Sequence, residues 1–507
     1  MPTLKRPGVF LEERPPLQIP PAGTISTSTA AFVGVANRGP SKPTLCTDYA
    51  DFQRLFGDVT TSTSELAFQV YSFFANGGGQ AYVARVAGAG AAVSTRTFLD
   101  RQGVPAATLV VNAHNPGLWG NGLFVEVTDT PGTGASATQF DLTVYFGGAT
   151  TGFVVERFTG LSMTPTDNNY SLTVVNGAFS GSKYIALAQP TTPSPGVAPL
   201  NLPSAQTPKQ LTNGTDGTAP TDGNFSTVLA SLDQVQEPFN LGVPGGSVGQ
   251  HSLALTYAQE RGDVFVVCDL PVTTGLSAAT AITTAGSLTA TSYGAVYWPN
   301  LIFNNPASTL PGATRIQGPS GAVLGLIALT DATRGIQKAP AGLTTRIAGA
   351  LAPQVQLTNA DLDDLNVAQV NAIRNIPGSG VVVMGARTLK AGASDRYVPI
   401  RRVLIYCKAN LIALSQFAVF EENTAATRET VASTLALFLN DAWRRGILKG
   451  DSPGDAYYVV CDGSNNSTTS ISQGIVNVEV GVSLITPAEF IVIRIGQFEG
   501  GSSAKEV

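Results

Sequence analysis

The chain has 507 residues, of which 13% are charged and 43% are hydrophobic, and its formal net charge is -5. This length exceeds what one hydrophobic core supports, so several domains are expected. The acidic balance argues against direct binding of nucleic acid, which needs clustered Lys and Arg. A charged fraction well below the roughly 25% of typical globular domains suits surfaces that become buried against other subunits.

Targeting and ligand motifs are scarce in this sequence. The first twenty residues continue from Lys5 and Arg6 into prolines instead of an apolar core, which predicts no secretory signal. No apolar run reaches the roughly 18 residues of a membrane span. We therefore expect a protein made in a cytoplasm, without membrane insertion, cofactor or metal. Buried, reduced thiols are predicted for the four widely spaced cysteines, which are Cys46, Cys268, Cys407 and Cys461.

Residues 1–27 are rich in proline and predict an extended N-terminal arm, because proline lacks an amide hydrogen and has a fixed φ. Within the arm, Val9, Phe10 and Leu11 can form a short strand that has no local partner. Such a segment suits strand addition to a neighbouring sheet, and the alternative is a disordered tail. Farther along, a helix is predicted over Glu65–Ala75, with the glycines that follow as its stop.

Residues 91–205 alternate apolar and polar side chains between Gly, Thr, Asn and Pro, as in Leu123–Val127 and Asp141–Phe146. This pattern predicts an antiparallel β domain. In residues 206–387 the pattern changes to helices followed by apolar strands, which predicts a parallel sheet covered by helices. The predicted pairs are Val228–Val235 with Phe239–Val243, Leu253–Ala258 with Val264–Cys268, and Val367–Ile376 with Val381–Met384.

Residues 388–496 predict an α+β domain, followed by a polar tail over residues 497–507. Asn423 or Thr424 can cap a helix whose apolar face runs from Val431 to Ala442. The predicted strands are Val403–Tyr406, Ala418–Phe420, the alternating run Val476–Val482, and Phe490–Ile495, whose consecutive apolar residues Phe490–Ile493 imply burial on both faces.

A serine hydrolase would need a serine, a base and an orienting carboxylate close together. His251, Asp269 and Ser320 could supply such a triad, but Ser320 lies in a Gly-Pro-Ser-Gly turn and equally suits a helix N-cap. Asp361 and its acidic neighbours lack the glycine and distal glutamate of a calcium loop, so they predict an ordinary helix start. The expectation is that the protein is not an enzyme.

Short motifs recur along the chain in one order. They are PGVFLEE at Pro7–Glu13, STSTAAFVGVANRGP at Ser26–Pro40, DFQRLFG at Asp51–Gly57, FFANGGGQAYVARV at Phe73–Val86, RGDVFVVCDLP at Arg261–Pro271, YGAVYWPNL at Tyr293–Leu301, GPSGAVLGLIALTDATRGIQKAPAG at Gly318–Gly342, the segment Arg387–Gly450, and PAEFIVIRIGQ at Pro487–Gln497. In these motifs the chain resembles contractile phage tail sheath proteins, over roughly the first 90 and the last 290 residues.

The resemblance implies a multidomain α+β and α/β protein. Residues 28–90 would be the N-terminal part of the sheath core, residues 206–387 a subtilisin-like αβ domain with a parallel sheet, and residues 388–496 the C-terminal α+β domain. Residues 91–205 would be an inserted antiparallel β domain that faces outward. Extended N- and C-terminal arms would link neighbouring subunits, through residues that the resemblance places at Val9, Phe10, Leu11, Glu12, Phe490, Val492 and Ile495.

The resemblance also implies a function. A sheath subunit forms a helical homo-oligomer around an inner tube protein, with baseplate and terminal cap proteins as further partners. The long helix of the last domain would face the tube, which points to Arg444, Arg445 and Lys449, although cations near a helix C-terminus also simply favour its dipole. Assembly would take place in a bacterial cytoplasm.

Two other classes of protein stay open at this point. A β-rich surface adhesin would explain the low charge and the Thr and Gly content, and a subtilisin-like serine hydrolase would explain the αβ pattern. The sequence also leaves open whether a sheath of this kind belongs to a phage tail, a bacteriocin particle or an extracellular injection system.

Overall fold

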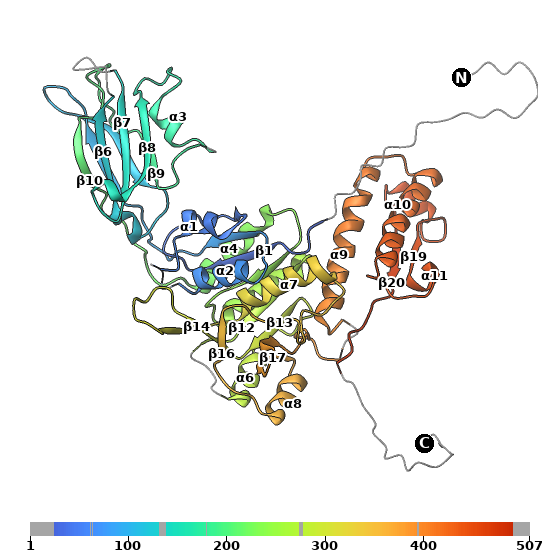
Figure 1. Ribbon diagram of the computed structural model, residues 1–507. Helices are drawn as coiled ribbons and strands as arrows, with labels where there is room; N and C mark the ends of the chain where they lie inside the picture. Colours follow the sequence, from blue (N-terminus) through green and yellow to red (C-terminus); the bar gives the residue numbers. More distant parts are fainter. Residues whose placement is uncertain are drawn as a thin grey trace, which may run out of the picture.

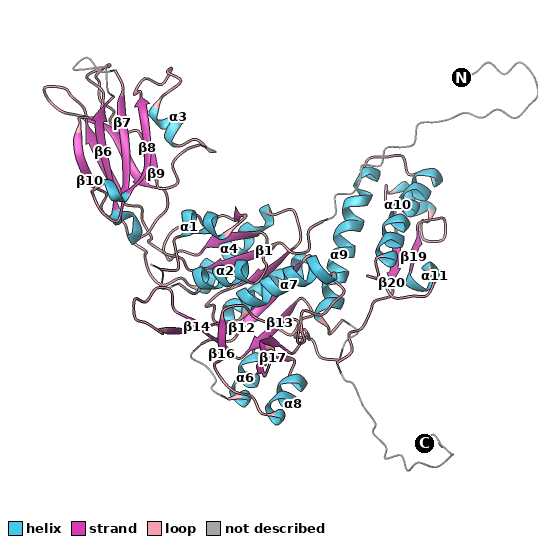
Figure 2. Ribbon diagram, viewed as in Figure 1, coloured by secondary structure: helices cyan, strands magenta, loops and turns pink. Residues whose placement is uncertain are grey.

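The computed structural model describes residues 25–489, apart from residues 61, 63, 131–137, 179, 273–276 and 393–394. Figure 1 shows three bodies: a β-rich lobe, a central domain built on a large sheet, and a domain that contains the long helices α9 and α10. Strands dominate the lobe, whereas helices and strands mix in the central domain (Figure 2). None of the helices in these described ranges has both the length and the apolar character that crossing a membrane requires.

The central domain contains an eight-stranded sheet in the order β18-β17-β13-β12-β11-β1-β3-β2. Neighbours from β17 through β3 run parallel, while β18 and β2 are antiparallel edge strands. The strands are β1 (Ala30–Gly34), β2 (Thr44–Cys46), β3 (Ala81–Arg85), β11 (Phe239–Gly242), β12 (Val264–Asp269), β13 (Gly294–Trp298), β17 (Val370–Ile376) and β18 (Gly380–Val383). The predicted parallel sheet is confirmed.

Side chains of the parallel strands alternate between two hydrophobic cores, one on each face. In β1, Phe32 joins one core, and Ala31 and Val33 join the other. Every residue of β12 is buried, as expected for a strand covered on both faces. The first core contains α1 (Tyr49–Phe56), α2 (Glu65–Ala75) and α7 (Ser320–Arg334), and the second contains α4 (Asp222–Ser231), α5 (Val248–Arg261), α6 (Ala278–Ala285) and α8 (Asn359–Val367).

Glycines allow α7 to pack directly against α2. A Cβ atom at Gly321 would clash with the carbonyl oxygen of Gln69, and one at Gly325 would clash with that of Phe73. The predicted helix over Glu65–Ala75 is confirmed, and the chain turns after it at Gly77, whose φ is 99°. This close packing brings Gln69 beside the N-terminus of α7.

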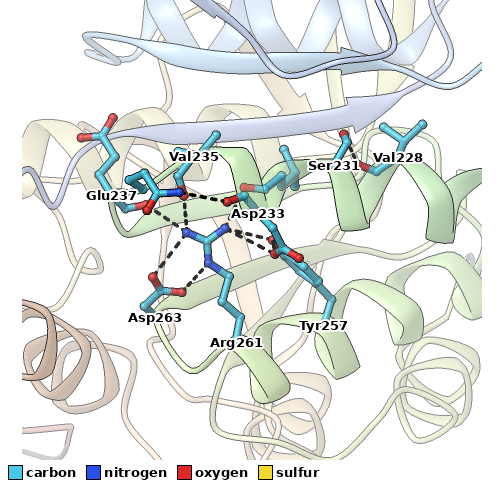
Figure 3. A network of polar contacts seen from close by, with 10 residues as sticks. Val228, Ser231, Asp233, Val235, Glu237, Tyr257, Arg261 and Asp263 are labelled. Carbon is cyan, nitrogen blue, oxygen red and sulfur yellow. Dashed lines mark hydrogen bonds and ion pairs between the residues drawn. The ribbon is translucent and has the colours of Figure 1, made fainter.

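Arg261, in the last turn of α5, fastens the α4–β11 connection to the sheet (Figure 3). Its guanidinium donates to the carbonyl oxygen of Leu232 over 2.7 Å and to Asp263 over 2.7 Å, and it also bonds the carbonyl oxygen of Val235. The same group lies 4.8 Å from the centre of the Phe239 ring. These contacts fix the start of β11 against α5, so the αβ unit is held by polar contacts as well as by the apolar core.

A small antiparallel sheet flanks the central domain and consists of β14 (Leu301–Asn304), β15 (Thr314–Gln317) and β16 (Ala350–Pro353). One expectation is wrong beside it. The segment Val367–Ile376 was predicted as a helix, but α8 ends at Val367 and residues from Val370 onward form β17. Gln369 has a φ of 61°, which breaks the helix, and the apolar spacing then serves a strand between β13 and β18.

The lobe consists of two antiparallel sheets around one core, in the orders β10-β6-β7-β8 and β4-β5-β9. Its elements are β4 (Thr95–Leu99), β5 (Ala107–Ala113), η1 (Leu118–Gly122), β6 (Leu123–Asp129), β7 (Phe140–Phe146), η3 (Thr151–Phe153), β8 (Val154–Leu161), α3 (Ser171–Val175), β9 (Ile185–Ala188) and β10 (Gln206–Gln210). The predicted strands at Leu123 and Asp141 are present and pair with each other. The chain enters and leaves the lobe through paired segments, with bridges from Ala92 to Thr215 and from Thr95 to Thr212.

In the last domain, two of the predicted strands are absent. Val403–Tyr406 lies inside α9 (Val398–Ser415). Ala418 ends the 3-10 turn η5 (Gln416–Ala418), and Val419 and Phe420 are not in a strand. The run Val-Leu-Ile-Tyr favours a strand locally, but Pro399 suits the first turn of a helix, and the buried residues Arg402, Val403 and Tyr406 share one helical face. The remaining elements are α10 (Ala425–Arg444), α11 (Pro453–Ala456), β19 (Tyr457–Val460), α12 (Thr468–Ser472) and β20 (Glu479–Val482).

Candidate functional site

Asp269 and Ser320, two residues considered for a catalytic triad, are in direct contact. Asp269 ends β12 and Ser320 begins α7. The Ser320 hydroxyl donates to Oδ2 of Asp269 over 2.7 Å, and the Ser320 amide donates to Oδ1, also over 2.7 Å. Gln69, from α2, donates to Oδ2 over 2.8 Å. The fold therefore holds the carboxyl group of Asp269 in the interior with three donors.

The sequence predicted Ser320 as an N-cap, which is wrong. Pro319 is the N-cap and Ser320 is the first helical residue, so its free N–H is bonded by Asp269 from the adjacent strand. Burial raises the pKa of Asp269 to about 6, and the hydrogen bonds from Ser320 and Gln69 oppose this rise. Gln69 was not singled out from the sequence, although a polar residue between Phe68 and Val70 in an apolar helix was the available clue.

His251 does not join this cluster. Its ring is fully buried on α5, and neither ring nitrogen has a hydrogen-bond partner among the described residues. Burial lowers the pKa of His251 to about 4. A serine nucleophile needs its base within hydrogen-bond reach. As placed here, His251, Asp269 and Ser320 therefore do not form a triad.

Other candidate ligands have structural roles. The four cysteines are buried and unpaired, as predicted. Burial raises the pKa of Cys407 to about 12, which keeps its thiol neutral. Asp361 accepts a hydrogen bond from the backbone N–H of Thr358 over 2.9 Å, which closes the capping box of α8. This agrees with the ordinary helix start predicted there.

The last domain carries a small sheet beside an apolar groove. β19 and β20 form an antiparallel pair, and each has only the other as a sheet neighbour in the described part of the chain. A groove of about 410 Å³ runs between this sheet and the helices α9 and α10. Its apolar lining includes Leu404, Leu411, Ile412, Leu435, Val478 and Val480. An apolar groove beside a two-stranded sheet is suited to an added strand, since strand addition satisfies the free backbone groups at a sheet edge.

Of the three cations predicted to face the tube, Arg444 and Arg445 lie at the end of α10 and Lys449 follows five residues after the helix. Arg444, Arg445 and Lys449 are all exposed. Arg445 pairs with Asp441 over 3.3 Å, one turn earlier on the same helix. An exposed pair of this kind contributes little to stability, so these side chains are available for contacts with another protein.

The predicted linking residues lie outside the described residues. These are Val9, Phe10, Leu11 and Glu12 in the N-terminal arm, and Phe490, Val492 and Ile495 at the other end. The described chain begins at Ile25 and ends at Glu489, and both of these ends contact the folded body.

Comparisons with known proteins agree with this architecture. Residues 229–389 match the family described as the phage tail sheath protein central domain. The tail sheath protein of Enterobacteria phage T4 is 28% identical over 172 residues, which cover 33% of this chain and 25% of that protein. The aligned part therefore spans a quarter of the length of this relative.

Solved structures extend the likeness to nearly the whole chain. A chain of the anti-feeding prophage baseplate has a TM-score of 0.57 at 19% identity, covering 98% of this chain and 100% of that chain. A chain of the contracted sheath of an extracellular contractile injection system has a TM-score of 0.55 at 21% identity, covering 98% and 99%. The sheath tail protein from Listeria innocua has a TM-score of 0.61 at 14% identity, covering 86% and 89%.

At these identities the solved structures show the fold, which is the multidomain α+β fold of subunits from contractile assemblies. Residues 229–389 are similar to the central domain of phage tail sheath proteins. The resemblance drawn from the sequence motifs is confirmed.

Proposed function

We propose that this chain is a structural subunit of a contractile sheath, which polymerises helically around an inner tube and contracts to drive the tube through a target envelope. The observation that carries the proposal is the likeness of fold over 98% of the chain to a contracted injection-system sheath. Heterologous contacts that do not close on themselves build a helical array from identical subunits. Contraction is then a bistable change in which rigid domains dock anew while the links between subunits persist.

Each part of the chain has a role in this proposal. The subtilisin-like αβ domain over residues 206–387, completed by residues 28–90, forms the rigid body of the subunit. The inserted β lobe, proposed over residues 91–205, faces outward from the sheath. Residues 1–27 and the end of the C-terminal domain, residues 388–496, supply the linking arms, and residues 497–507 form a polar tail. β4 begins at Thr95, inside this range, whereas β10, at Gln206–Gln210, extends the lobe just past residue 205.

The groove beside β20 supports a specific link between subunits. Its occupant in the proposal is the Val9–Glu12 segment of a second copy of this chain. The groove is lined mainly by apolar side chains, which suits the apolar residues Val9, Phe10 and Leu11. It borders β20, whose only sheet neighbour among the described residues is β19. The chain between Glu12 and Ile25 can span at most about 45 Å, which is enough to reach a neighbouring subunit.

The contact with the inner tube must hold before firing and release afterwards, which favours a small polar contact. Arg444, Arg445 and Lys449 are exposed at or shortly after the end of α10 and suit this role. Baseplate and terminal cap proteins would bind the ends of the array, and assembly would take place in a bacterial cytoplasm. The same subunit would suit a phage tail or an extracellular contractile particle.

Negative-stain electron microscopy of purified protein, alone and with the co-encoded tube protein, tests the proposal. We expect hollow striated cylinders from the full chain. Deletion of residues 2–20 should abolish the cylinders and leave a folded monomer, whereas deletion of residues 501–507 should leave assembly intact. Full-length protein that stays monomeric at high concentration with tube present would refute the sheath function. Cylinders from the arm-deleted protein would refute only the linking role of the arm.

A pair of matched substitutions tests the groove itself. Ile412 lines the groove and is 52% exposed, so Ile412→Lys should leave the monomer folded while it blocks an apolar strand. Leu437 is 68% exposed on α10 and does not line the groove, so Leu437→Lys is the control. We expect cylinders from the control and monomers from Ile412→Lys. Equal assembly by both variants would place the linking strand elsewhere.

A further inference from the structure

Two arginines, Arg402 and Arg387, bind residues close to the two ends of the described chain. Arg387 follows β18, the last strand of the central sheet along the chain, and Arg402 lies in the second turn of α9. Arg402 contacts Thr27, near the N-terminal end of the described residues, and Arg387 contacts Glu489, at their C-terminal end. Neither contact was expected from the sequence.

At the N-terminal side, Arg402 brings three distant segments together. Its guanidinium donates to the carbonyl oxygen of Thr27 over 3.0 Å, to Oδ1 of Asp331 over 2.9 Å and to Oδ1 of Asn240 over 3.2 Å. Thr27 in turn donates through its hydroxyl to Asp331 over 2.8 Å, and Asn240 donates to the carbonyl oxygen of Thr27 over 2.9 Å. The side chains of Arg402 and Asp331 are only 3% and 4% exposed. Thr27 is therefore fixed by its backbone and its side chain at once.

At the C-terminal side, Arg387 and Glu489 form a two-pronged ion pair. Nε of Arg387 donates to Oε1 of Glu489 over 2.8 Å, and a terminal nitrogen donates to Oε2 over 2.5 Å. The Tyr397 hydroxyl donates to Oε2 over 3.2 Å. Arg387 also donates to the carbonyl oxygen of Asn366, so the pair is anchored on the end of α8. This bidentate geometry fixes the direction of Glu489 as well as its position.

The two contacts belong to one rigid unit. Arg387 and Tyr397 are bridged as in an antiparallel ladder, and the Val398 amide donates to the carbonyl oxygen of Ala386 over 2.9 Å. α9 starts at Val398 and carries Arg402 in its second turn. The side chain of Asn371, in β17, bonds both the N–H and the carbonyl oxygen of Arg387 over 2.7 Å. The pairing of residues 386–387 with residues 397–398 thus positions both Arg387 and the start of α9, which carries Arg402.

We infer that residues 386–387 and 397–402 form a double clamp that sets the direction in which both terminal arms leave the central domain, an inference that rests on the proposed linking of subunits by these arms. A buried ion pair by itself is weak evidence for stabilisation, because desolvation offsets the attraction. What distinguishes these pairs is their location, at the last described residues before each arm. A fixed direction at the base of each arm would keep the arm oriented relative to the central domain while subunits rotate against one another.

Glu489→Gln tests the clamp, because this side chain is 20% exposed and its loss should not unfold the domain. A nitroxide on Thr486→Cys reports the motion of the chain next to Glu489, and labelling is selective because all four native cysteines are buried. We expect the population of mobile label on the monomer to rise about tenfold, as for loss of a charge-assisted bond. Cylinder formation should fall in parallel, while the melting temperature of the monomer stays close to that of the unsubstituted chain.

Exchanging the charges of Arg387 and Glu489 tests whether the ion pair itself positions the chain at Glu489. Arg387→Glu combined with Glu489→Arg restores opposite charges, so it should recover immobile label and cylinders that neither single change allows. Arg54→Gln, which removes an exposed pair with Asp51, is the control and should change nothing. Unchanged label mobility and assembly in Glu489→Gln would overturn the clamp. Absence of cylinders from the unsubstituted chain would count against the sheath function instead, since the label is read on the monomer.

Discussion

The contact between Asp269 and Ser320 illustrates how far single residues could be interpreted from the sequence. The sequence places an aspartate after an apolar strand and a serine before a helix, and the structure joins them. It does not bring His251 to them, and it satisfies the N-terminus of α7 with a carboxyl group from another strand. The result is a buried polar junction between β12, α2 and α7 rather than a nucleophile with a base.

Asp269→Asn should change how stability depends on pH. The folded pKa of Asp269 is about 6, well above its ordinary value of 3.8, so between about pH 4 and pH 6 the unfolded chain releases a proton that the folded protein keeps. Its contribution is therefore greatest at about pH 4 and is lost as the pH rises through 6, by about 3 kcal/mol. The variant should lack this slope.

Urea denaturation of both proteins at several pH values from 4 to 7 measures the difference. His251, whose pKa burial lowers to about 4, produces a slope of the opposite sign, but it is present in both proteins and cancels in the difference. A difference in unfolding free energy that stays constant over this range would mean that the pKa of Asp269 in the folded protein is close to its ordinary value of 3.8.

At the scale of single elements, the cap of α10 was predicted correctly, whereas two short apolar runs were assigned to the wrong kind of element. Thr424 caps α10 as predicted, with its side chain accepting a hydrogen bond from the N–H of Thr427. Val403–Tyr406 was predicted as a strand and is a helix, whereas Val370–Ile376 was predicted as a helix and is a strand. A cap acts within a few residues of itself, whereas a short apolar run takes the conformation that its distant neighbours require.

Thr424→Ala should destabilise the last domain by about 1 kcal/mol, because it leaves an N–H of the first turn of α10 without its partner. Thr430→Ala is the matched control, since it makes the same chemical change inside the same helix, where alanine is the better helix former. Urea denaturation of both variants checks this. A larger loss in Thr430→Ala than in Thr424→Ala would show that the cap is not what stabilises this end of the helix.

At the scale of the whole molecule, the β lobe is joined to the central domain by a narrow connection. Two paired segments carry the chain, and Thr95 and Thr212 exchange hydrogen bonds of 2.8 and 3.2 Å where the lobe begins. The Arg38 guanidinium lies 4.6 Å from the centre of the Tyr184 ring, and Arg85 pairs with Asp216 over 3.4 Å. Since the lobe has its own hydrophobic core, the central domain does not depend on it for burial of its strands.

Replacement of residues 96–211 by an Asn-Gly turn should therefore leave a folded protein. Thr95 and Thr212 form the hydrogen-bonded pair that a two-residue hairpin turn requires. We expect cooperative unfolding, a stability loss of about 1 kcal/mol from the stacking of Arg38, and cylinders that still form if the sheath function holds. Circular dichroism, thermal unfolding and electron microscopy measure these outcomes, with Arg38→Gln in the full chain as the control for the lost stacking. Unfolded protein would show that the lobe is integral to the fold.

Local sequence patterns were enough to predict the αβ pattern, the parallel sheet, the β-rich lobe and the resemblance to sheath proteins, because each rests on periodicity or on motifs within a few residues. The tertiary structure alone decided which polar residues meet. Arg402 and Thr27 are 375 positions apart, and Arg387 and Glu489 are 102 apart. No local pattern marks such partners, since their contact exists only after the sheet has placed the ends of its strands and helices. The groove beside β20 and the two arginine clamps were therefore visible only in the folded chain.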